Sequence, residues 1–272
     1  ATVVSNGGSI AFDRSVYPVP WTANDLYSGD GTAAGNSEAG KVIAWITVDD
    51  ADETNDTLTT GSTSAAGLIL IKHTNSTGTS TIGTAGSITS YDGTAGTVAA
   101  ELGPLNELYL GASSFETSIT ITETMGYSAG TITVQAGDIL QAVYVDTADD
   151  AGSTSTFYDS STFDLRTGSL SVDKDVYVMG SDMVVTITDP DLNVDSASTE
   201  SYALSIIEWD SSANSSALLN ISSFSANPSS IEETGSNTGV FQTVVTLPVS
   251  TVGTGTPEYG ESVTLTYVDV GL

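Results

Sequence analysis

The stretch GSIAFDRSVY at residues 8–17 recurs as GSLSVDKDVY at residues 168–177. Both stretches alternate polar and apolar residues and then end on an Asp, a basic residue and a Val-Tyr pair. Alternation with period two is typical of a β-strand that buries one face. The chain therefore contains two copies of one β-rich module.

An apolar strand and then an acidic loop follow each copy. The second loop places oxygen-bearing side chains at alternate positions, Asp189, Asp191, Asn193 and Asp195. The first loop keeps the carboxylates of Asp50, Asp52 and Asp56 but has Thr54 in place of the Asn. Side-chain oxygens that converge in a turn are the ligands that calcium requires. The pattern predicts calcium at both loops, more weakly at the first; the alternative is an acidic turn between strands.

Each copy closes on a Gly-acid pair and a Tyr-x-Asp motif. These are Gly137-Asp138 with Tyr144-Val145-Asp146, and Gly260-Glu261 with Tyr267-Val268-Asp269. Further candidate cation ligands are Asp146, Asp269 and Glu233, which opens a Gly-rich turn. For Glu233 the alternative is ordinary turn chemistry, in which Gly and Asn supply positive φ angles.

Period-two or β-branched runs make up nearly every regular segment, and no convincing amphipathic helix is present. Examples of such runs are residues 42–48, 118–122, 131–134, 183–187 and 263–268. Closely spaced strands without helical crossovers indicate antiparallel sandwiches. We predict an all-β protein of two tandem Ig-like antiparallel β-sandwich domains with an extra N-terminal strand.

The predicted domains follow from the two copies. Residues 1–7 form an N-terminal extension and a candidate donor strand, residues 8–165 the first domain, and residues 168–272 the second. The first copy carries an insertion at residues 21–41, where Trp21 and Tyr27 are unusual for a plain linker. Residues 156–167 form the join between the domains, and they are too apolar for a free linker.

The charge balance limits the partners. Five basic residues against 34 acidic ones give a formal net charge of −29. Nucleic acid is excluded because the chain has almost nothing with which to neutralise phosphates, and anionic lipid is disfavoured. No stretch is apolar enough for a membrane helix, so membrane insertion is not expected. High salt or divalent cations would relieve the self-repulsion.

The remaining composition favours a secreted protein. The chain contains no Cys, so neither disulfides nor a thiolate site is available. It begins with Ala, which we interpret as the start of a mature chain after removal of a signal peptide. We expect an extracellular or cell-surface location. Candidate N-glycosylation sites in that setting are Asn55, Asn75, Asn214 and Asn220.

No catalytic residue is predicted. His73 is the only histidine, and no Gly-x-Ser-x-Gly motif presents a nucleophile. Carboxylates in turns are usually too solvated for a raised pKa. For Trp21, Trp45 and Trp209 we expect packing in a core or an interface rather than a sugar-binding platform. The sequence therefore predicts no enzyme and no organic cofactor.

Three motifs resemble the Ig-like repeats of archaeal surface-layer proteins, most closely those of ammonia-oxidising archaea. They are DRSVYPVP at residues 13–20, TDPDLN at residues 188–193 and ETGSNTGVF at residues 233–241. The resemblance implies a structural glycoprotein that polymerises into an extracellular filament, tube or surface-layer-like array. It also implies donor-strand complementation between subunits.

Assembly is expected to use the N-terminal extension. Completion of the next subunit's sheet would produce a homopolymer, and the residues expected to do this are Ala1, Thr2, Val3, Val4 and Ser5. A rival reading is an adhesin or carbohydrate-binding module for cell-surface glycans, which an exposed aromatic row with Trp21 and Tyr27 would favour. A second rival is a hydrolase, which a buried carboxylate pair in a cleft would favour.

Overall fold

The structure is a computed structural model, and it describes residues 7–22, 25–29, 40–51, 57–58, 69–84, 105–108, 113–127, 130–146, 153–213, 215–249 and 256–270. In these ranges the chain is all-β, and its single helix is the short 3-10 turn Leu204–Ile206. The sheets are mostly antiparallel, which confirms the predicted fold class and is consistent with β-sandwich architecture. No helix within these ranges is long and apolar enough to cross a membrane.

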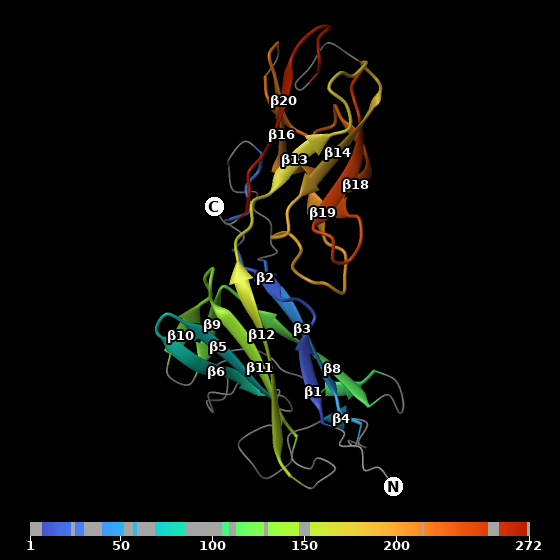
Figure 1. Cartoon of the computed structure of the whole chain (residues 1–272). Coiled ribbons are helices and arrows are strands. Elements are labelled where there is room, and N and C mark those ends of the chain that lie inside the picture. The colour runs from blue at the N-terminus through green and yellow to red at the C-terminus, as the bar shows by residue number, and fades with distance from the viewer. Residues whose placement is uncertain are drawn as a thin grey trace. The chain divides into compact units, whose positions relative to one another are not determined.

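The chain divides into two compact units, each described by itself (Figure 1). The first unit comprises Ala1–Pro20 and Lys41–Asp164, and the second comprises Trp21–Gly40 and Leu165–Leu272.

The first unit has two five-stranded sheets and a small hairpin. One sheet has the order β1-β3-β8-β7-β4, with β1 (Ser9–Phe12), β3 (Val42–Asp49), β8 (Ser114–Ile121), β7 (Leu105–Glu107) and β4 (Thr57–Leu58). The other has the order β2-β12-β11-β5-β6, with β2 (Val16–Pro18), β12 (Ser155–Asp164), β11 (Ile139–Asp146), β5 (Ile69–Asn75) and β6 (Gly78–Thr84). The hairpin pairs β9 (Thr124–Tyr127) with β10 (Gly130–Thr133).

Both large sheets supply one apolar core. In β3 the residues Val42, Ala44, Ile46 and Val48 are buried in alternation, as the period-two pattern predicts. They belong to the same buried cluster as Ile71 of β5, which lies in the other sheet. Two sheets that share one core in this way form a sandwich.

Strand β12 corrects the predicted join between the domains. Residues 156–167 were expected to connect the domains, but most of them form β12, which lies between β2 and β11 (Figure 1). It pairs antiparallel with β11 and parallel with β2. The apolar residues of this segment have a simple explanation, because Phe163 is fully buried in the first core.

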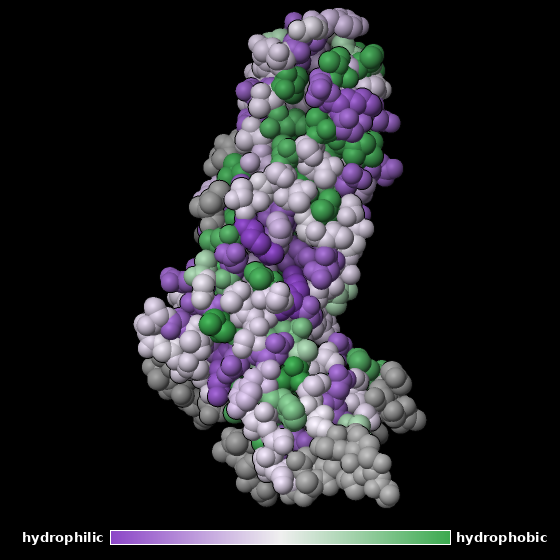
Figure 2. All heavy atoms as spheres, viewed as in Figure 1, coloured by the Kyte–Doolittle hydropathy of each residue, from purple (hydrophilic) through white to green (hydrophobic). Residues whose placement is uncertain are grey.

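The second unit has a five-stranded and a three-stranded sheet. The larger has the order β13-β14-β19-β18-β15, with β13 (Ser169–Val172), β14 (Asp182–Thr188), β19 (Val240–Thr246), β18 (Ser225–Glu233) and β15 (Ser201–Ala203). The smaller has the order β17-β16-β20, with β17 (Ala217–Leu218), β16 (Ile207–Ser211) and β20 (Val263–Tyr267). Figure 2 shows hydrophobic residues, in green, that reach the surface of this unit beside hydrophilic ones.

Trp21–Gly40, nearly all of the insertion expected in the first domain, belongs to the second unit. Trp21 and Leu26 are buried in the second core. The Trp21 indole N–H donates to the Asp191 carbonyl over 3.2 Å, and its ring lies 6.4 Å from that of Tyr202. The segment follows Trp21 into this core because burial of a large aromatic ring is set by the surface available to it, not by its place along the chain.

Candidate functional site: a duplicated carboxylate network

The two units repeat the same hydrogen bonds at their opening strands. In the first unit Asp13 accepts from the Tyr17 hydroxyl at 2.5 Å and from the Trp45 amide at 2.8 Å. In the second unit Asp173 accepts from the Tyr177 hydroxyl at 2.6 Å and from the Val184 amide at 2.9 Å. The recurring sequence motif is therefore a recurring clamp that ties the segment after the first strand to its neighbour.

The Tyr-x-Asp motifs form a second repeated contact. Tyr144 donates its hydroxyl to Asp50 at 2.6 Å, and Tyr267 donates to Asp189 at 2.5 Å. Asp50 is 3% exposed and Asp189 is fully buried. Each acid follows the second strand of a five-stranded sheet, β3 or β14, whereas each Tyr lies in or at the end of a strand of the other sheet. The contact therefore joins the two layers of each unit.

The same two acids meet a left-handed residue. The Asp50 amide donates to the Ser113 carbonyl at 2.9 Å, and the Asp189 amide donates to the Gly239 carbonyl at 2.8 Å. Ser113 has φ 53° and Gly239 has φ 60°. The backbone path is thus common to both copies, although only the second has the residue that adopts it without strain.

We expect Gly239→Ala to lower the free energy of unfolding of the second unit by about 1–2 kcal/mol, because a Cβ is unfavourable at this φ. The added Cβ would also lie 3.0 Å from the Pro190 Cα. Ser113→Gly is the matched variant, and its effect should stay below about 1 kcal/mol, since relief of strain is offset by the entropy of the unfolded Gly. Urea unfolding measures both; equal losses in the two variants would contradict the shared backbone path.

A third repeated contact ties the Gly-acid pairs to the adjacent strand. Asp138 lies 2.9 Å from Nε2 of His73, and Glu261 accepts from the Ser211 hydroxyl at 2.7 Å. His73 pairs with Leu140, and Ser211 pairs with Val263, at corresponding places in β11 and β20. His73 therefore holds a position that the other copy fills with Ser, which is a structural use of the only histidine.

Most of the predicted cation ligands of the second loop are held by other partners. The two oxygens of Asp191 accept from the Arg166 amide at 2.6 Å and from its guanidinium Nε at 3.1 Å. The two oxygens of Asp195 accept from the Ala197 amide and the Ser198 hydroxyl. Asn193 donates to Asn237 at 3.0 Å. These groups shape the loop, in agreement with the alternative that it is an acidic turn.

Glu233 fastens the Gly-rich turn through one oxygen. Its Oε1 accepts from the amides of Thr238 and Gly239 at 2.7 and 2.8 Å. Its Oε2 is buried and has no hydrogen-bond partner among the described residues, and the same holds for Oε2 of Glu200. Burial, and then the neighbouring Glu233 carboxyl, raises the pKa of Glu200. No motif in the sequence marks Glu200, which lies one residue before β15 and was not predicted as a site residue.

Asp189 and Asp269 form a second carboxylate pair. A Cβ on Gly168 would lie 2.7 Å from Oδ2 of Asp189 and 3.1 Å from Oδ1 of Asp269. The Gly168 amide donates to Oδ2 of Asp269 at 2.9 Å, whereas Oδ1 is buried without a partner among the described residues. Burial raises the pKa of Asp189, and its hydrogen bond from Tyr267 only partly offsets this.

The predicted ligands that the structure describes do not all meet at one site. Within the described ranges no three His, Cys, Asp or Glu side chains form a group that could hold a metal ion. In the first unit Asp50 and Asp146 are buried, whereas Asp52 and Asp56 lie outside the described residues. The arrangement offers two carboxylate pairs in the second unit, and neither pair lines the groove described below.

The remaining predicted sites are distributed over both units. Asn75 lies in the β5–β6 hairpin, where its side-chain oxygen accepts from the Thr77 amide and hydroxyl. Asn220 is exposed in a turn. Asn55, Asn214 and the assembly residues Ala1, Thr2, Val3, Val4 and Ser5 lie outside the described residues. Trp21 is buried, so it cannot contribute to an exposed aromatic row.

No protein-family model matches the chain, and no curated protein matches it.

Proposed function

We propose that this chain is a secreted, non-enzymatic structural protein that self-assembles into an extracellular filament, tube or surface-layer-like array. The observation that carries the proposal is the duplicated network. Asp50 and Asp189 bond to the β framework at corresponding places in the two units. Buried carboxylates that are used for hydrogen bonds within the β framework suit a repeated structural building block.

Sequence features support the same proposal. The charge of −29 suits an extracellular setting, where salt and divalent cations are plentiful. The resemblance to Ig-like surface-layer repeats adds a structural role by analogy. Strand donation by residues 1–5 of one copy to another would propagate a polymer, because the contact is heterologous.

Calcium belongs to the proposal as a stabiliser. Oδ1 of Asp269 and Oε2 of Glu233 are buried without a hydrogen-bond partner among the described residues, and they provide acceptors that a hard cation prefers. At each place the cation would replace a proton and relieve repulsion within the pair. Glycans at the exposed Asn220 and at Asn75 would then project from the assembly surface.

The test is negative-stain microscopy of the purified chain with calcium and with a chelator, beside a variant that lacks residues 1–6. We expect polymers from the full chain, looser polymers in chelator, and folded monomers from the deletion variant. Particles of the full chain that stay monomeric in every condition would overturn assembly. Polymers that persist after the deletion would overturn strand donation while leaving a structural role in place.

A further inference from the structure

Among its described residues, the second unit has no counterpart of strand β12 of the first unit. In the first unit β11 pairs with β5 along one edge and with β12 along the other. The matching strand of the second unit, β20, pairs with β16 along one edge. No described residue of the second unit pairs with its other edge. An unpaired edge presents a row of free backbone donors and acceptors to any extended segment.

The side chains that β12 covers in the first unit are uncovered in the second. Tyr17 and Leu140 are fully buried, whereas their counterparts Tyr177 and Val263 are half-buried. The side chain of Arg14 is 10% exposed, and that of its counterpart Lys174 is 57% exposed. The clamp between Asp173 and Tyr177 is nevertheless intact, so the local structure is the same and only the cover differs.

The segment after β13 also has no strand partner among the residues that the structure describes. In the first unit Val16, Tyr17 and Pro18 form β2 and pair in parallel with β12. The corresponding Val176 and Val178 are 82% and 75% exposed. Apolar side chains exposed to this extent, next to a free sheet edge, are typical of a surface that another chain covers.

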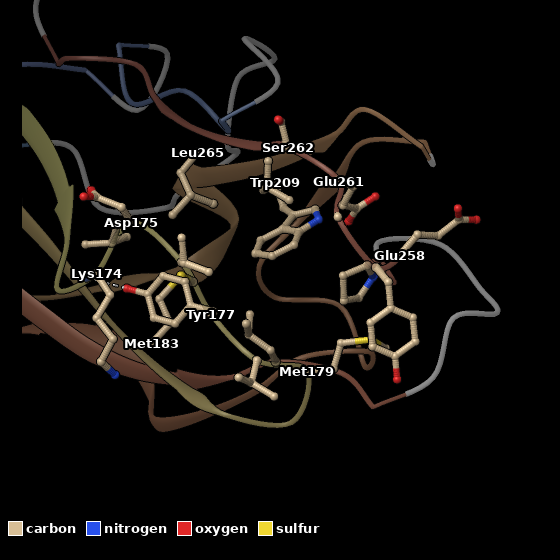
Figure 3. Close-up of a pocket in the computed structure, with 18 residues that line it drawn as sticks. Lys174, Asp175, Tyr177, Met179, Met183, Trp209, Glu258, Glu261, Ser262 and Leu265 are labelled. Atoms are coloured by element: carbon tan, nitrogen blue, oxygen red, sulfur yellow. Dashed lines mark hydrogen bonds between the residues drawn. The ribbon is translucent and has the colours of Figure 1, made fainter.

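These surfaces border one groove, with a volume of roughly 750 Å³. It runs between the segment around Tyr177 and strand β20, and Figure 3 shows Tyr177, Trp209 and Leu265 turned toward its open space. The Trp209 ring is 4% exposed, and its indole N–H has no hydrogen-bond partner among the described residues. The groove therefore combines apolar walls with an unpaired backbone edge, as an incoming β-strand requires.

The register of the repeat identifies a matching strand. Residues 161–164, STFD, form the end of β12 and precede the Gly168-Ser169 step. Residues 1–4, ATVV, precede the Gly8-Ser9 step by the same distance. Val3 thus corresponds to Phe163, whose side chain is fully buried against the first core.

We infer that the groove between residues 176–178 and β20 is the acceptor for residues 1–4 of a second copy of this chain. This inference rests on the proposed assembly and specifies its register. Thr2 lies opposite Ser262, as Thr162 lies opposite Ile139 in the first unit. Ala1 and Val3 face the core, and Thr2 and Val4 face outward. Each junction between copies then repeats the strand order β2-β12-β11.

The test uses disulfide trapping, in which no native thiol can form a competing disulfide because the chain has no Cys. Residues directly opposite each other in adjacent strands lie within the Cα separation that a disulfide spans. The variant Thr2→Cys/Ser262→Cys should give a ladder of covalent oligomers on a non-reducing gel. Each single variant should give dimers at most. The matched control Thr2→Cys/Thr264→Cys keeps the same outward face but shifts the register, and it should give no ladder.

Microscopy of the same samples separates this inference from the proposed function. Polymers without a covalent ladder would overturn the inference and leave assembly standing, because another segment would then fill the groove. A ladder of equal strength from the register-shifted control would overturn the assigned register. Monomers without any ladder would overturn the inference and the proposed function together.

Discussion

We expect Arg166→Met to destabilise the second unit by about 3 kcal/mol at pH 8, since loss of one partner leaves a buried charge uncompensated. Asp191 is 1% exposed, and Arg166 supplies an amide, a guanidinium contact at 3.1 Å and a further bond to the Pro190 carbonyl. Met retains much of the apolar stem, so the change removes mainly the charge and its hydrogen bonds.

The loss should depend on pH in a defined direction. Burial raises the pKa of Asp191, and Arg166 only partly offsets this effect. A carboxyl group whose pKa is higher in the folded state favours folding most below its unfolded pKa of about 3.9, and loses that contribution as the pH rises through the folded value. Removal of Arg166 raises the folded pKa further. The difference between wild type and variant should therefore grow as the pH rises above about 4.

The control is Arg166→Met combined with Asp191→Asn, which removes the buried charge along with its partner. Most of the lost stability and all of the added pH dependence should disappear, because a neutral amide does not ionise. Urea unfolding at pH 5 and pH 8 measures this. A loss that is equal at the two pH values would contradict the ion-pair explanation.

We expect Trp21→Ala to lower the free energy of unfolding of the second unit by about 3–5 kcal/mol, the usual range for a buried aromatic residue. Trp21 is 5% exposed within the second core, although the chain places it directly after the first strands of the first unit. Its carbonyl accepts from the Gly40 amide at 2.8 Å, and a Cβ on Gly40 would clash with the indole. The segment is thus fitted closely around this ring.

Fluorescence can assign the effect to one unit. Among the three tryptophans only Trp45 lies in the first unit, so Trp45→Phe leaves probes in the second unit alone. In that background Trp21→Ala should shift the fluorescence-detected unfolding of Trp209. Trp45→Ala is the matched control; Trp45 is only half-buried on β3, so it should cost less and act on the first unit. If the unfolding transition of Trp209 is unchanged after Trp21→Ala, the assignment of residues 21–40 to the second unit is contradicted.

Local pattern predicted the strands well. The alternation over residues 42–48 and 183–187 corresponds to β3 and β14, because a half-buried strand imposes period two on its own sequence. The recurring Asp and Tyr positions also marked real contacts. What the repeat did not reveal was the partner of each group, since Tyr144 and Asp50 meet across two sheets.

Contacts between distant segments explain the remaining differences. Residues 156–167 were predicted to join the domains because a packed connection and an inner strand have a similar apolar composition. Strand β12 is defined instead by its pairing with β2 and β11. Arg166 carried no motif, yet it occupies the oxygens of Asp191 that were expected to bind a cation. Glu200 is distinguished only by its proximity to Glu233, which no spacing in the sequence expresses.

The free edge of β20 also has a thermodynamic consequence. A segment that pairs there binds the folded unit and not the unfolded chain, so its occupancy adds to the free energy of unfolding by mass action. The melting temperature of the second unit should then rise with protein concentration, while that of the first, whose edge β12 already covers, should not. Dilution alone would separate the two units in a calorimeter.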